Sequence, residues 1–357
     1  MFDEERGPFL NVTSEIGKLK AVLLHKPGKE LERLTPDYLR DLLFDDIPWL
    51  RKMRDEHDEF ADVLRQRGAK VYYIEDLLAE ILTDLDVKRN LINDILINSN
   101  IENHELRELI FSYIFSKTPA EAAEIAIAGL NKKDIQDVDR EYSLSDYIRK
   151  DYPLYINPIP NLYFMRDPLS IIGNGISINS MQTNARRREP MLIKYIYDYN
   201  PLFRKEYSQV WYNYTIPHSI EGGDILVLSK EVVAVGCSER TSANGIEMLA
   251  RNLFAGDNDI KEVLAVQIPP LRAFMHLDTV FTMVDRDKFT VYPGILDRVD
   301  VYRLTPGGRN GIKVTPENDL VAALKKSLKL PAVSLIQSGG GDTITAAREQ
   351  WNDSTNT

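Results

Sequence analysis

The chain contains three stretches in which apolar residues alternate with polar ones, and each stretch predicts a β-hairpin. In residues 274–293, two runs rich in β-branched and aromatic residues flank a charged turn at Asp285–Lys288. Residues 220–236 and 163–179 repeat the pattern, and the stretch at 163–179 has an Asn-Gly turn, which is a strong hairpin signal. We therefore predict a repeated strand-turn-strand unit.

Each predicted hairpin has titratable side chains where its first strand begins. His276 and Asp278 are two residues apart, so both are expected to project from the same face of the first strand. A fourth copy of the unit is predicted from residue 338 onward, with Asp342 at its start. If the units pack around a pseudo-symmetric axis, the strand starts converge on one pocket that contains Asp167, Glu221, Asp224, His276 and Asp278.

Strands and helices are also predicted outside the hairpins. Residues 20–28 and 70–74 are typical of short strands, and apolar residues at helical spacing predict a helix over residues 49–64. His25 ends the first of these strands, where a histidine is more often structural than part of a site. His57 lies on the apolar stripe of the helix and is interpreted as a hydrogen-bonded core histidine.

The composition changes between residues 76 and 150, where glycine nearly vanishes and helical periodicity is close to continuous. A capping box at Thr118–Glu121, with proline at the first helical position, predicts the start of one helix. We predict an α/β protein whose α/β domain comprises residues 1–75 and 151–357, interrupted by an all-helical insertion at 76–150.

Composition limits the classes of function. The chain has 357 residues, 43% hydrophobic and 27% charged, which is ordinary for a globular protein. A net charge of −10 makes a nucleic-acid partner unexpected, because phosphate binding needs a basic surface. One cysteine, Cys237, rules out an internal disulfide and fits a reducing compartment. With no signal-peptide pattern and no run long enough to span a membrane, we predict a cytoplasmic protein with no membrane partner.

Three interpretations compete for the titratable residues at the strand starts. As a metal site, His218, Glu221, Asp224, His276 and Asp278 supply nitrogen and oxygen ligands, but none lies at the spacing of a dedicated metal motif. As plain structure, the acids bond turn amides near glycines, as in EGGD and GGGD. The similar placement of acids in several repeats makes plain structure less favoured.

The favoured interpretation is recognition of a guanidinium or a similar planar cation. A guanidinium offers five donors in a rigid fork, and two carboxylates such as Asp167 and Asp278 can clamp its two edges. His276 beside them is a suitable group for moving protons. Asn161, Arg186 and Arg240 are candidates to hold the far end of an amino-acid substrate through its carboxylate.

Six motifs in order closely resemble the bacterial arginine deiminases: NLYFMRDP, ARRRE, EGGD, GCSERTS, MHLDTVFTMVD and AAREQWND. The match extends from Gly17 to the last residue. It implies a pseudo-fivefold α/β propeller of ββαβ units, and hydrolysis of L-arginine to L-citrulline and ammonia without metal or cofactor. The implied site has His276 as general acid and base, Asp167 and Asp278 as the clamp, Glu221 and Asp224 as support, and Asn161, Phe164, Arg186 and Arg240 around the rest of the substrate.

The family's mechanism uses a cysteine nucleophile that lies beyond the AAREQWND motif, so the resemblance implies a nucleophile outside residues 1–357 and an incomplete last unit. Cys237 follows a predicted strand near a helix start, which would lower its pKa, but it lies in GCSERTS, away from the family's nucleophile. We therefore expect an arginine deiminase in which residues 1–357 alone are inactive. The alternative is a truncated, inactive arginine-binding or assembly protein. The oligomeric state is left open, with a homo-oligomer among the options.

Overall fold

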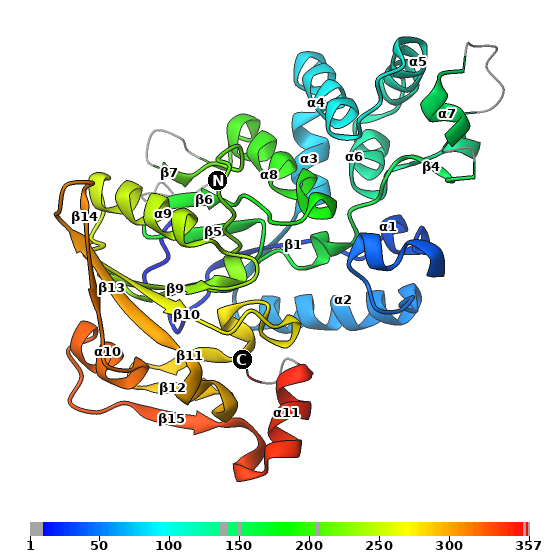
Figure 1. Ribbon diagram of the computed structural model, residues 1–357. Coiled ribbons are helices and arrows are strands. Elements are labelled where there is room, and N and C mark those ends of the chain that lie inside the picture. The colour runs from blue at the N-terminus through cyan, green and yellow to red at the C-terminus, as the bar shows by residue number, and fades with distance from the viewer. Residues whose placement is uncertain (1–9, 136–141, 149–150, 204–207, 353–354, 356–357) are drawn as a thin grey trace. The chain divides into compact units, whose positions relative to one another are not determined.

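The computed structural model describes residues 10–135, 142–148, 151–203, 208–352 and 355, and its elements are labelled in Figure 1. The chain folds into two compact units. The first lies within residues 1–18, 166–182 and 202–357, and the second within residues 19–165 and 183–201. Both units mix helices and strands, so the predicted α/β class is confirmed.

The described residues of the first unit form three sheets. Its helices are α9 (Ala243–Ala255), α10 (Leu320–Ser327) and α11 (Thr343–Trp351). One sheet has the order β5-β6-β7, a second has the order β14-β13-β10-β9-β8, and a third has the order β11-β12-β15. The strands are β5 (Leu169–Ile172), β6 (Gly175–Ile178), β7 (Gln209–Tyr212), β8 (Ile225–Ser229), β9 (Val232–Cys237), β10 (Glu262–Gln267), β11 (Phe281–Asp285), β12 (Lys288–Val291), β13 (Asp300–Pro306), β14 (Ile312–Pro316) and β15 (Ser334–Gln337).

All three predicted hairpins are confirmed as the antiparallel pairs β5–β6, β8–β9 and β11–β12. The second strand of each hairpin then pairs in parallel with a later strand, as in β6–β7, β9–β10 and β12–β15. A parallel neighbour needs a crossover, and α9 and α10 lie in two of these connections. The hairpin pattern therefore belongs to a larger repeat of two antiparallel strands followed by a parallel third.

The five-stranded sheet has apolar residues on both faces, because successive side chains of each strand point alternately into two cores. One core includes α10 and the β11–β12 hairpin, and its strand residues include Leu226, Ala234, Leu264 and Val266. The other includes α9, and its strand residues include Val227, Val233, Val263 and Ala265. Burial on both faces explains why ILVLS and VVAVG are almost continuously hydrophobic.

Two details of the predicted strands are wrong. His276 and Asp278 do not lie on a strand: His276 precedes the 3-10 helix η9 (Leu277–Thr279), and the ladder begins only at Phe281. The reason is that the Leu277 N–H donates to the Asp224 carboxylate (2.8 Å), which holds the chain in a turn. The predicted fourth hairpin is the helix α11, because the Asp342 side chain accepts from the Thr345 N–H and caps a helix.

Within the described part of the chain, the second unit has two small sheets and most of the α-helices. β1 (Ala21–Leu24) pairs in parallel with β2 (Lys70–Tyr73), and β3 (Leu130–Asn131) pairs with β4 (Leu154–Ile156). Its helices are α1 (Lys29–Glu32), α2 (Leu50–Gln66), α3 (Ile74–Ile81), α4 (Leu85–Asn98), α5 (His104–Phe115), α6 (Pro119–Ala128), α7 (Leu144–Ile148) and α8 (Arg188–Tyr199). The predicted capping box is confirmed at the start of α6.

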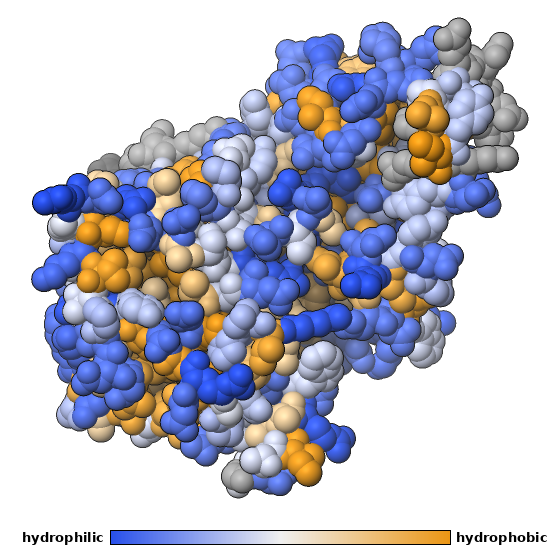
Figure 2. All heavy atoms as spheres, viewed as in Figure 1, coloured by the Kyte–Doolittle hydropathy of each residue, from blue (hydrophilic) through white to orange (hydrophobic). Residues whose placement is uncertain are grey.

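Figure 2 shows one face of the protein, on which hydrophilic residues predominate and hydrophobic residues occur in separate patches. No helix in the part of the chain that the structure describes has the length and apolar character needed to cross a bilayer.

Candidate active site

The first unit gathers titratable residues from the starts of three hairpins. Asp167 precedes β5, and His276 and Asp278 belong to the turn before β11. Glu221 precedes the turn η7 (Gly222–Asp224) before β8, and Asp224 is its last residue. All five side chains are buried, with at most 7% of each residue exposed. The structure thus brings together the residues that the sequence placed at equivalent positions of the repeat, and we call them the acidic cluster.

His276 is the centre of this cluster. Its Nε2 lies 2.9 Å from Glu221 Oε2, within hydrogen-bond distance, and its Nδ1 lies 3.7 Å from Asp167 Oδ1, beyond it. Burial by itself lowers the pKa of His276. The charge of Asp167, the hydrogen bond to Glu221 and the charge of Asp224 outweigh that effect and raise the pKa to about 10. The imidazole is therefore charged at neutral pH, and Glu221 fixes it through Nε2.

Glu221 is fixed by bonds of its own. One carboxylate oxygen accepts from the Gln182 N–H (3.0 Å), and the Glu221 N–H donates to the Thr241 hydroxyl (3.0 Å). The second glycine of the EGGD motif permits the approach of the imidazole. A Cβ on Gly223 would lie 2.6 Å from His276 Nδ1. The EGGD motif thus supplies both the carboxylate and the space beside it.

Asp224 connects two of the hairpins. It accepts from the Ser238 hydroxyl (2.6 Å) through one oxygen and from the Leu277 N–H (2.8 Å) through the other. Burial raises the pKa of Asp224 to about 6, although the charge of His276 and the bond to Ser238 oppose the rise. Asp224 therefore positions the turn that carries His276 and interacts with it electrostatically.

The surroundings of Asp278 oppose its ionisation. Burial raises its pKa to about 7, with a further contribution from the neighbouring Asp167 and Asp224, while the charges of His276 and Arg166 oppose the rise. Arg166 Nε lies 3.5 Å from Asp278 Oδ2. Near neutral pH the site thus contains a buried carboxyl that is only partly ionised, because burial disfavours its charged form and the neighbouring carboxylates add to that effect.

Four buried carboxyls therefore surround one imidazolium. Of Arg166 and Arg240, the first also contacts a carboxylate outside the cluster, and the second lies at the limit of ion-pair distance. Arg166 also contacts Glu15, and Arg240 Nη1 lies 4.0 Å from Glu221 Oε2. Buried charges of one sign are costly unless a counter-charge reaches them. A cationic ligand with several N–H donors would offset this negative charge, so the arrangement favours binding of a planar cation.

The other predicted substrate residues, Asn161, Phe164 and Arg186, lie together in the second unit. The Arg186 guanidinium donates to both oxygens of the buried Glu189 and to the carbonyls of Asn161 and Phe164. The Asn161 amide donates to the Leu42 carbonyl (2.7 Å), and Phe164 is 50% exposed. Arg186 is thus held by a carboxylate partner that the sequence did not indicate.

Further residues that bond to the cluster or to its neighbours do not follow from the sequence, among them Arg166, Glu15 and Ser238. Arg166 had a signal, because it precedes Asp167 within the same motif. Glu15 had none, since it is 151 positions away from Arg166 in the chain.

Cys237 does not have the properties of an activated nucleophile. It ends β9, and burial together with the charge of Asp224 raises its pKa above the ordinary value of a thiol. The expectation that its position would lower the pKa is therefore wrong. The helix-start effect is outweighed because a carboxylate and an apolar environment both disfavour a thiolate.

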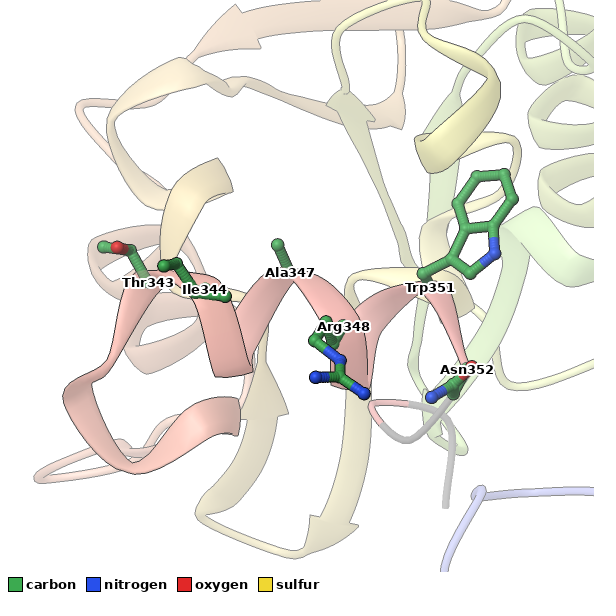
Figure 3. Close-up of a pocket in the computed structure, with 6 residues that line it drawn as sticks. All are labelled: Thr343, Ile344, Ala347, Arg348, Trp351 and Asn352. Atoms are coloured by element: carbon green, nitrogen blue, oxygen red, sulfur yellow. The ribbon is translucent and has the colours of Figure 1, made fainter.

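A shallow hollow elsewhere in the first unit is not a competing site. It follows one face of α11 and is lined by Thr343, Ile344, Ala347, Arg348, Trp351 and Asn352. Figure 3 shows Ala347 and Trp351 projecting from the same side of that helix. Arg348 is the single charged residue of the lining, so the hollow lacks the acid–base groups of the acidic cluster.

Among the described residues, no group of three or more histidine, cysteine, aspartate or glutamate side chains has the arrangement needed to hold a metal ion. The metal interpretation of His218, Glu221, Asp224, His276 and Asp278 therefore gains no support within that part of the chain.

Comparison with known proteins identifies the family to which this chain is similar. The family model described as arginine deiminase matches residues 40–357. The chain is 48% identical to the arginine deiminase of Bacillus cytotoxicus over 352 residues, covering 98% of this chain and 86% of that protein. It is also 48% identical to the arginine deiminase of Clostridium perfringens, with 98% and 85% covered, and 44% identical to that of Latilactobacillus sakei, with 98% and 86% covered.

Proposed function

Since this chain belongs to the arginine deiminase family, we propose that it hydrolyses a C–N bond of L-arginine and yields L-citrulline and ammonia. The observation that carries the proposal is the acidic cluster, in which the buried carboxyls of Asp167, Glu221, Asp224 and Asp278 lie around the imidazole of His276. A guanidinium stays charged at every physiological pH and offers several N–H donors, so it fits this environment.

Each residue of the cluster has a proposed role. Asp167 and Asp278 clamp the guanidinium, and Glu221 holds His276 through Nε2. That contact leaves Nδ1, which lies 3.7 Å from Asp167, on the side where protons are exchanged. Asp224 acts indirectly, through its bond to the Leu277 N–H beside His276. Glu221 is a positioning residue in this assignment, because its bond fixes the imidazole.

The proposed chemistry has two steps. A cysteine thiolate attacks the guanidinium carbon, and ammonia leaves with a proton donated by His276. The resulting S-alkylthiouronium is then attacked by water. His276 accepts one proton of this water, the thiolate leaves, and the second proton passes to solvent as L-citrulline forms. The raised pKa of His276 keeps the imidazole in the protonated form from which the first donation starts, and the neighbouring carboxylates stabilise this imidazolium.

Cys237 is not the thiolate in this proposal, because burial and Asp224 raise its pKa. We propose that residues 1–357 by themselves bind L-arginine without turnover. Asn161, Phe164, Arg186 and Arg240 are retained as proposed contacts of the amino-acid end of the substrate. The support for the first three is family membership. For Arg240 it is also a buried Nε that has no hydrogen-bond partner among the described residues.

We further propose that the repeat of two antiparallel strands and a parallel third is part of an α/β propeller, and that residues 76–150 are a helical insertion in it. Three copies of the repeat in the first unit support the propeller, and the run of helices α3 to α6 supports the insertion. A cytoplasmic location and a homo-oligomer stay predictions.

Titration calorimetry tests the proposed substrate. L-Arginine is expected to bind, L-citrulline to bind far more weakly because it lacks the charge, and agmatine more weakly because it lacks the carboxylate. Absence of binding by L-arginine, or equal binding of L-citrulline, would contradict the proposal. An Asp278→Asn variant serves as the control, since it removes a clamp carboxylate but retains the side-chain shape.

A further inference from the structure

Arg166 lies between the acidic cluster and the first described residues of the chain. On one side its Nε is 3.5 Å from Asp278 Oδ2. On the other side it contacts Glu15, with 3.1 Å between Nη2 and Oε2. It also donates to two main-chain carbonyls, those of Gly222 (3.3 Å) and Ile225 (2.9 Å). These carbonyls belong to the segment that carries Glu221 and Asp224.

Glu15 is itself attached to the first unit by two further bonds. Its second carboxylate oxygen accepts from the Val227 N–H (2.7 Å), and its own N–H donates to the Val227 carbonyl (2.8 Å). Val227 lies in β8, so Glu15 is fixed to the strand that follows the EGGD turn. One oxygen of Glu15 thus remains directed at Arg166, and the arginine is held from both ends.

We propose that Arg166, anchored by Glu15, is the positioning residue that keeps Asp278 ionised so that Asp278 can accept a guanidinium. This inference rests on the proposed function, because it concerns the affinity of the same site for L-arginine. Arg166 touches no substrate atom in this role and acts only through the carboxylate beside it.

The charges around Asp278 explain why such a residue is needed. Asp167 and Asp224 face Asp278 and disfavour its ionised form, while His276 and Arg166 favour it. Glu221 and Asp167 are also the partners of His276, so the imidazolium is shared among several carboxylates. Arg166 pairs with Asp278 and with Glu15, which lies outside the cluster, and the charge of Asp167 also acts on it.

The expected effect is a shift in the titration of Asp278. An opposite charge within about 4 Å moves the pKa of a carboxyl by roughly one to three units. The lower end applies because 40% of the Arg166 side chain is exposed. Removal of the charge is therefore expected to raise the pKa of Asp278 by about one unit. At pH 7 that shift weakens L-arginine binding about fivefold, and above about pH 9 the affinity recovers.

The decisive measurement is the titration of aspartate side-chain carbons by 13C NMR, with Asp278 assigned by an Asp278→Asn variant. Arg166→Met is expected to raise the pKa of Asp278. Arg166→Lys keeps the positive charge and is expected to leave that pKa close to the parent value. Arg251→Met is the matched control, because Arg251 pairs with Glu247 on the surface of α9. If Arg166→Met does not fold, Arg166→Gln provides the same test, since it keeps hydrogen-bond donors without the charge.

An unchanged Asp278 titration in the neutral variant would overturn the inference. The role of Glu15 is tested by the direction in which a Glu15→Ala substitution shifts the pKa of Asp278. If Glu15 anchors Arg166, Glu15→Ala raises the pKa of Asp278 in the same direction as Arg166→Met. A fall in that pKa would show that Glu15 acts only as a counter-charge and would overturn the anchoring role. Failure of the parent chain to bind L-arginine would contradict the proposed function, while the carboxyl titration would still decide this inference.

Discussion

Two buried histidines of this chain lie between carboxylates, His276 in the first unit and His25 in the second. His25 Nδ1 lies 3.1 Å from Glu75 Oε2 and its Nε2 lies 3.2 Å from Glu30 Oε1, so both nitrogens are within hydrogen-bond distance of a carboxylate. Burial by itself lowers the pKa of His25, but these two hydrogen bonds outweigh it and raise the pKa to about 9. In residue types and in titration, the two sites are closely similar.

The two sites differ in the other contacts that their carboxylates make. Glu30 also accepts from the Gly28 N–H, and Glu75 accepts from the Lys26 N–H. His25 therefore ties the end of β1 to α1 and to the start of α3, with a partner for each ring nitrogen. Around His276, in contrast, Nδ1 is 3.7 Å from the Asp167 carboxylate and two more carboxyls have raised pKa values. A hydrogen-bonded carboxylate at each ring nitrogen is typical of a structural histidine, whereas His276 Nδ1 lies beyond hydrogen-bond distance of the Asp167 carboxylate.

The largest expected effect is a loss of activity when His276 is replaced, and no such loss is expected when His25 is replaced. In a protein that carries its nucleophilic cysteine, His276→Ala is expected to lower the rate of citrulline formation by about a thousandfold, because proton transfer is lost. His25→Gln is the matched control and should retain the parent rate. Colorimetric citrulline assays, with circular dichroism as the check on folding, provide the measurement. Near-normal turnover by His276→Ala would remove the proposed acid–base role.

The second prediction concerns stability and its dependence on pH. The folded pKa of His25 is above the ordinary value of 6.5, so its stabilising contribution is complete below about pH 6.5 and is lost as the pH rises through about 9. His57, Lys26 and the two glutamates are the charged or titratable groups that face it.

Urea unfolding checks this contribution. The free energy of unfolding of the parent should exceed that of His25→Gln by about 3 kcal/mol at pH 6, and the difference should shrink toward zero near pH 9.5. A difference that stays constant across this range would mean that the charge of His25 contributes nothing to stability.

A third prediction concerns the clamp. Asp278→Asn removes a charge-assisted hydrogen bond to the guanidinium, which contributes about 2 kcal/mol, so the Kd for L-arginine should rise roughly 30-fold at pH 8. Asp285→Asn is the matched control, because Asp285 pairs with Lys288 in the exposed turn of the same hairpin. Calorimetry measures both variants. Equal affinity for the two would exclude Asp278 from the site.

The weakest effect is expected at Cys237. Its pKa is raised and its side chain is partly buried, so Cys237→Ala should leave citrulline formation within about twofold of the parent in a protein with its nucleophile. Loss of the covalent intermediate in that variant, as observed by mass spectrometry after acid quenching, would instead identify Cys237 as the thiol that attacks.

Local features of the fold were predictable because they depend on neighbouring residues. The three hairpins follow from alternating apolar residues and their turns, and the α6 capping box follows from Thr118 and Glu121. Local reasoning did not predict where the strands start. His276 and Asp278 were placed on a strand and Asp342 on a hairpin, but side-chain bonds to main-chain amides hold these residues in a turn and at a helix start.

The membership of the acidic cluster could be inferred from the chain alone, since Asp167, Glu221 and His276 all stand where a hairpin begins. Their pairing could not, because it depends on tertiary packing. Glu221 and His276 are 55 positions apart, and Glu15 and Arg166 are 151 apart. Side chains so far apart along the chain meet only when the sheets pack against one another, and burial then sets their pKa values. The position of a charged group along the chain is local information, whereas its partners and its exposure to solvent are products of packing.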